Sequence, residues 1–117
     1  MAIRMMVQSS PPKILENMWL RDNAEMIRSM GAEAYLTGLV NEVRREFGHN
    51  ERANRRIRTD LTNRSILAAP GIEMMIHSKP PKAIEQAWLK DHCYLIEKLG
   101  PEAYLSDMLD ELRSRYG

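Results

Sequence analysis

The sequence has very little cysteine and no long apolar run, and both absences narrow the kind of protein that it encodes. Its 117 residues include one cysteine, Cys93, so no disulfide can form within the chain, which is typical of a reducing compartment. No apolar run approaches the roughly 20 residues of a membrane span. The first residues, MAIRMMVQSSPP, are too few and too polar for a secretory signal. We therefore expect a cytoplasmic protein with no membrane partner.

Aromatic residues and net charge are also scarce. The chain has one Phe against nine Met, which predicts an adaptable aliphatic and thioether core. The formal net charge is +1, but it is unevenly distributed. Residues 49–71 contain five Arg against Glu51 and Asp60, a net charge of +3, whereas residues 72–117 carry six basic and eight acidic residues, a net charge of −2.

The most informative feature that is present is an internal repeat. Residues 3–48 align without a gap on residues 72–117, and 20 of the 46 aligned positions are identical. A unit of this size with one strand-like segment cannot close a core alone. Two copies can close one together, as a homodimer does. We therefore predict a single domain over residues 1–117, in which the connector at 49–71 joins two halves of a pseudo-dimer.

Each repeat is expected to contain a short strand and two helices. Residues 3–8 and 72–77 alternate in polarity, so Ile3, Met5 and Val7 are expected on one face of a strand. Segments 12–30 and 81–99 follow as long helices that end at Gly31 and Gly100. The next helices span 33–47 and its copy, where Pro101 marks the helix start. The expected fold is mainly α with a two-stranded antiparallel ribbon.

Within the long helix, an apolar stripe contains an acid. The stripe is formed by Leu15, Met18, Trp19, Met26 and Met30, and Asp22 lies in its middle, with Asp91 at the equivalent position. Either the helix breaks near Asp22, which would then cap a new helix, or the acid is partly buried. The sequence leaves both alternatives open. Trp19 and its equivalent Trp88 are interpreted as core anchors.

This order of elements, a strand and two helices written twice, resembles the ribbon-helix-helix superfamily in its single-chain tandem form. The resemblance implies that exposed ribbon side chains bind bases in the major groove of double-stranded DNA. Carried over by position, the readers would be Arg4, Met6, Gln8, Glu73, Met75 and His77. Arginine, glutamine and glutamate each suit a particular base edge. Connector arginines Arg55, Arg56 and Arg58 would add phosphate contacts.

No catalytic or metal-binding pattern competes with that interpretation. His77, His92 and Cys93 match no zinc spacing, and adjacent residues of a helix point apart. No histidine, nucleophile or Gly-rich loop shares the repeat position of Asp22 and Asp91, so acid–base catalysis has no second group. We expect no enzyme activity, no metal and no cofactor.

The leading hypothesis is therefore a non-enzymatic DNA-binding protein, either a transcriptional regulator or an accessory factor in DNA processing or plasmid transfer. The alternative is a helical protein–protein interaction module, such as an anti-activator or scaffold, which binds a protein partner and no DNA. The acidic second repeat favours the alternative, as do the methionines Met6 and Met75 on the expected exposed face, because methionine-bearing surfaces adapt to protein partners.

Overall fold

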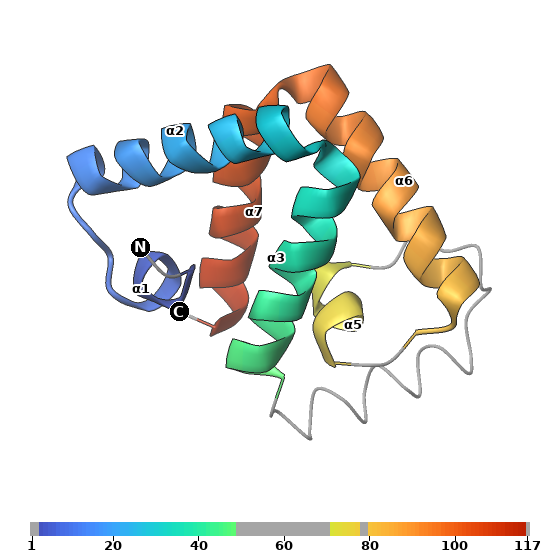
Figure 1. The fold of residues 1–117 in the computed structure, drawn as a ribbon. Helices are drawn as coiled ribbons and strands as arrows, with labels where there is room; N and C mark the ends of the chain where they lie inside the picture. Colours follow the sequence, from blue (N-terminus) through green and yellow to red (C-terminus); the bar gives the residue numbers. More distant parts are fainter. Residues whose placement is uncertain (1–2, 49–70, 78–79, 117) are drawn as a thin grey trace.

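The computed structural model describes residues 3–48, 71–77 and 80–116, and within these ranges every regular element is a helix (Figure 1). The first repeat contributes a short helix and two long ones, and the second repeat contributes the same series. The helices are α1 (Ile3–Gln8), α2 (Lys13–Met30), α3 (Ala32–Phe47), α5 (Ile72–His77), α6 (Lys82–Leu99) and α7 (Pro101–Tyr116).

The predicted ribbon is wrong, and with it the assignment to the ribbon-helix-helix superfamily. Residues 3–8 and 72–77 are the helices α1 and α5. In α1 the buried side chains are Ile3, Met6 and Val7, which have the i, i+3, i+4 spacing of a helix face. A segment of only six residues, rich in apolar side chains, fits both the two-residue period of a strand and the 3.6-residue period of a helix. A two-stranded ribbon alone is marginal in water, whereas a helix satisfies its own backbone and buries one face.

The long helices lie where the sequence predicted them, within one residue at each end of α2, α3 and α6. Glycine ends the first long helix of each repeat, Gly31 with a φ of +95° and Gly100 with a φ of +92°. This backbone conformation is almost confined to glycine. The chain therefore turns sharply between α2 and α3, and again between α6 and α7.

Neither alternative for the acid in the middle of the first long helix is correct. The helix α2 runs unbroken through Asp22, and both Asp22 and Asp91 are exposed. The buried face of α2 is formed by Trp19, Ala24 and Ile27, so it is rotated away from the predicted stripe. Met18, Met26 and Met30 are among the exposed large apolar residues.

The two repeats exchange their short first helices, α1 and α5, so that each packs mainly on the last helix of the other repeat. Helices α1 and α2 of the first repeat pack on α7 of the second, while α5 and α6 of the second pack on α3 of the first (Figure 1). One continuous cluster of buried side chains, including Leu36 and Leu105, joins the repeats. At one end of the molecule the rings of Phe47 and Tyr116 stack with centroids 4.8 Å apart.

Each short helix is hydrogen-bonded to the opposite repeat by one arginine, and the two arginines occupy equivalent positions. Arg113 of α7 donates hydrogen bonds from Nε (3.1 Å) and Nη2 (2.8 Å) to the carbonyl oxygen of Met6. Arg44 of α3 donates in the same way to the carbonyl oxygen of Met75. Arg113 also binds Glu16 Oε1 at 2.8 Å through Nη1. Each guanidinium thus satisfies a carbonyl near the C-terminal end of a short helix, where intrahelical donors run out.

Candidate binding pockets

The residues predicted to read DNA bases do not form one exposed surface. Met6 and Met75 are both 0% exposed and belong to the core. Arg4 is exposed, but its Nη1 lies 3.5 Å from Glu46 Oε2 and its Nε donates to Gln8 Oε1 at 3.2 Å. Gln8 is also exposed and donates to the carbonyl oxygen of Tyr116 at 3.5 Å. Since the strands are absent from the described ranges, the ribbon mechanism of base reading is wrong.

The remaining predicted DNA contacts cannot be placed. Glu73 and His77 belong to α5 by their backbone, but their side chains lie outside the described part of the structure. Arg55, Arg56 and Arg58 also lie outside the described residues.

The structure instead contains a pair of equivalent pockets, one in each repeat. The first lies between α1, α2 and α3, and the second between α5, α6 and α7. Every residue that lines the second pocket has its repeat equivalent in the lining of the first. The lining residues of the second pocket are Ile72, His92, Leu95, Leu99, Tyr104, Asp107, Met108 and Glu111. The pockets are therefore a property of the repeat itself.

A tyrosine held by a polar side chain forms the inner wall of each pocket. In the first, Tyr35 Oη donates to Asn23 Oδ1 at 2.8 Å, and Asn23 Nδ2 donates to the carbonyl oxygen of Trp19 at 2.9 Å. In the second, Tyr104 Oη lies 2.6 Å from Nδ1 of His92. Burial raises the pKa of both tyrosine hydroxyls, so they stay protonated at neutral pH.

The histidine of the second pocket is enclosed by aromatic rings. His92 stacks on Trp88 with ring centroids 3.9 Å apart and meets Tyr104 edge to face. Burial lowers the pKa of His92, although the nearby Asp91 opposes that shift. Loss of hydration disfavours the charged imidazolium. His92 is therefore a neutral packing residue near pH 7.

The two pockets differ most in size. The first has a volume of about 250 Å³ and the second about 130 Å³. Gly38 lines the first pocket where Asp107 lines the second, and a Cβ built on Gly38 would meet no atom within 4 Å. Met26 and Met30, which are 43% and 48% exposed, replace Leu95 and Leu99 at the rim. Substitutions in one repeat have thus widened one pocket.

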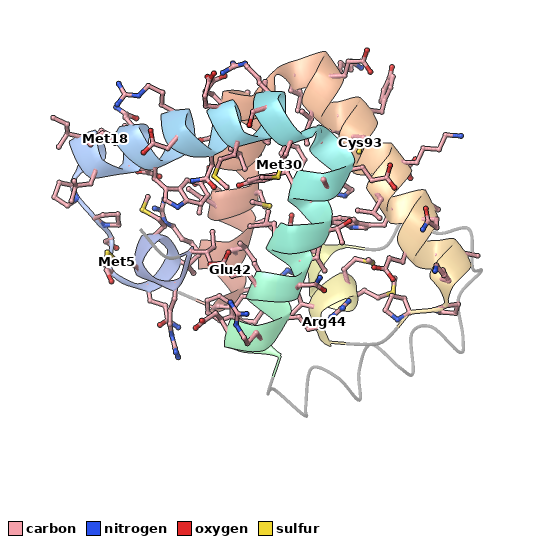
Figure 2. The ribbon with its side chains drawn as sticks, in the orientation of Figure 1. Met5, Met18, Met30, Glu42, Arg44 and Cys93 are labelled. Atoms are coloured by element: carbon pink, nitrogen blue, oxygen red, sulfur yellow. The ribbon has the colours of Figure 1, made fainter. Side chains whose placement is uncertain are left out.

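The carboxylates at the edges of the pockets also differ. Glu111 of the second pocket lies 3.9 Å from Arg115 Nε. The first pocket has Glu42 at the same position, but Glu46 occupies the place of Arg115. Figure 2 shows Glu42 on the side of α3 that faces α1, with Met30 farther along, where α2 meets α3. The first pocket is therefore open, apolar and acidic along one edge.

This site was not predicted from the sequence, because catalytic and metal-binding residues were considered at equivalent positions of the two repeats. Tyr35, Asn23 and Glu42 carry no motif, and their proximity depends on how α2 packs on α3. A signal was nevertheless present in the alignment. Gly38 stands opposite Asp107, and a glycine in the middle of a helix is unfavourable unless space is needed there.

The described residues show neither a metal site nor a membrane-spanning helix. In the part of the chain that the structure covers, no cluster of three or more His, Cys, Asp or Glu residues has the geometry of a metal site. No described helix is both long and apolar enough to cross a bilayer. The chain matches no family model, no curated protein and no solved structure.

Proposed function

We propose that this chain is a non-enzymatic protein-interaction module that receives an apolar side chain of a partner protein in the pocket of the first repeat. The observation that carries the proposal is the larger volume of that pocket, which is lined by Gly38 and by the half-exposed Met26 and Met30. Methionine side chains are flexible and polarisable, so a rim of them adapts to the shape of a partner.

The size of the pocket favours a protein side chain over a free small molecule. Pockets that enclose drug-sized ligands have volumes of roughly 300–1,000 Å³, whereas this one has about 250 Å³ and opens to the surface. One or two anchor side chains of a partner fill such a space. Anchors of this kind dominate the binding energy of many protein interfaces.

The groups that line the pocket do not favour catalysis. A general acid or base works best when its pKa lies near the working pH. The pKa of Tyr35 is raised by burial and by the charge of Glu42, so the hydroxyl is a poor proton donor and a poor nucleophile at neutral pH. Asn23 accepts the hydrogen bond of that hydroxyl and has no titrating group of its own.

The proposal can be tested without knowing the natural partner. A display library of helix-forming peptides is selected on the full chain, and the enriched peptides are titrated against purified variants by fluorescence polarisation. Gly38→Leu fills the pocket with an apolar side chain where the structure leaves room for one. Gly38→Ala is the matched control, because it adds one methyl group and keeps most of the space.

We expect enriched peptides to bind Gly38→Leu at least about ten-fold more weakly than the unchanged protein, a loss of about 1.4 kcal/mol. Gly38→Ala should retain binding within about three-fold, and a mixed DNA duplex should show no comparable affinity. If the selected peptides bind Gly38→Leu as well as they bind the unchanged protein, the pocket is not the binding site and the proposal fails.

A further inference from the structure

The wider pocket has a carboxylate without a cation beside it. Among the described residues, no Lys, Arg or His lies within ion-pair distance of Glu42, whereas Glu111 at the equivalent position has Arg115. Glu46, which replaces that arginine, is itself engaged by Arg4. Arg4 therefore neutralises the second acid of this edge and leaves the first free for an external cation.

The free carboxylate belongs to the pocket and not only to the outer surface. Glu42 lines the pocket together with Ile3 and Tyr35. It is only partly exposed, and its negative charge is close enough to raise the pKa of the Tyr35 hydroxyl. A partner that covers the pocket therefore removes water from this carboxylate. Desolvating a charge is costly unless an opposite charge replaces the lost hydration.

From this asymmetry we infer that the partner of the first pocket is a basic helical segment, in which a Lys or Arg lies one helical turn from the apolar anchor and pairs with Glu42. The inference rests on the proposed function. Gly38 and Glu42 are separated by one turn of α3, about 6 Å along the axis at 1.5 Å per residue. Residues i and i+4 of a partner helix have the same spacing, so an anchor over Gly38 places a basic side chain at Glu42.

The second repeat explains why the inference applies to one pocket only. Asp107 occupies the space that Gly38 leaves open, and Arg115 already pairs with the edge carboxylate. The second pocket is thus smaller, and its edge carboxylate Glu111 is paired within the chain, while Asp107 adds a second carboxylate to the lining. The smaller volume leaves less room for an apolar anchor there, so tight binding should show one site per chain.

The test uses two synthetic helical peptides that share a Leu anchor and differ four residues later, where one has Lys and the other Glu. Both are titrated against the full chain, against Glu42→Gln and Glu42→Lys, and against Glu111→Gln as the matched control in the second repeat. Gly38→Leu is titrated in parallel, because it reports whether any binding uses the pocket.

We expect the Lys peptide to bind the unchanged protein about five-fold more tightly than the Glu peptide, the size expected of a partly exposed ion pair. Glu42→Gln should remove the difference, Glu42→Lys should reverse it, and Glu111→Gln should leave it unchanged. The preference should shrink as salt is added, because salt screens exposed charges.

The outcomes separate this inference from the function on which it rests. If both peptides bind equally and Gly38→Leu weakens both, the pocket binds a protein but the charge preference is refuted. If neither peptide binding nor library binding responds to Gly38→Leu, the proposed function fails together with the inference. A preference for Lys that survives in Glu42→Gln but is lost in Glu111→Gln would place the basic group at the second pocket and overturn the inference.

Discussion

The arginine that fastens α1 to the second repeat should be one of the main determinants of stability outside the apolar core. Arg113→Met keeps most of the aliphatic stem and removes the guanidinium. The Met6 carbonyl then loses both of its arginine donors, which lie at 3.1 and 2.8 Å, and Glu16 loses a partner at 2.8 Å. The side chains of Arg113 and Glu16 are only 26% and 15% exposed, so water restores these contacts incompletely.

The expected cost follows from those contacts. A hydrogen bond with one charged partner contributes roughly 1.5–3 kcal/mol. The two bonds to Met6 share one acceptor, so they count as one such contact, and the ion pair adds up to about 1 kcal/mol at this exposure. We expect the free energy of unfolding to fall by about 1.5–4 kcal/mol. Arg45→Met, an exposed arginine of α3, should change it by less than about 0.5 kcal/mol.

Urea denaturation followed by circular dichroism and by tryptophan fluorescence measures this difference. The double variant Arg113→Met with Glu16→Gln should cost less than the sum of the two single variants, because both remove the same ion pair. Arg44→Met should behave like Arg113→Met, since it binds the equivalent carbonyl of Met75. A loss below about 0.5 kcal/mol for Arg113→Met would refute the idea that the arginine fastens α1.

The remaining predictions concern the core, the turns and pH. Trp88→Ala should cost about 3–5 kcal/mol in one cooperative urea transition, because Trp88 is 1% exposed in a cluster built by both repeats; two separate transitions would contradict this. Gly31→Ala should destabilise the protein by about 1–3 kcal/mol, because the φ of Gly31 is +95°. Gly38→Ala, in the middle of a helix, should instead stabilise it by roughly 0.5–1 kcal/mol. Urea denaturation midpoints measure both changes. The pKa of His92 is lowered in the folded protein from 6.5, so the unfolded chain binds the proton more readily and stability falls as the pH drops below about 6.5. His92→Asn, which copies Asn23, should lessen that fall when midpoints near pH 7.5 and pH 5 are compared.

The long helices could be predicted because the sequence contains recognisable start and stop signals at their ends. Pro12 and Pro81 precede them, and Gly31 and Gly100 end them at a φ that other residues rarely adopt. The short segments could not be assigned, because six residues are too few to separate a period of two from a period of 3.6. The buried set Ile3, Met6 and Val7 is decided by packing on the opposite repeat.

The candidate site was beyond sequence reasoning for a different reason. Its walls come from three helices, and the distance between Tyr35 and Asn23 depends on the packing of α2 against α3. The face of α2 was also misjudged, since Met26 and Met30 were expected in the core and instead form an exposed rim. The sequence feature that indicates the site is a difference between the repeats, because Gly38 and Asp107 occupy equivalent positions.

The exchange of first helices has a consequence for how the polypeptide can be reconnected. Helix α1 packs on α7, and Gln8 donates to the carbonyl oxygen of Tyr116 at 3.5 Å. The beginning of the first repeat and the end of the second are therefore neighbours, just as α5 neighbours α3. A circular permutant that joins residue 116 to residue 3 through a short linker, and opens the chain between residues 48 and 71, should preserve the contacts among the six described helices. In such a protein the second repeat would come first, and the pockets would exchange their order along the chain while keeping their positions in space.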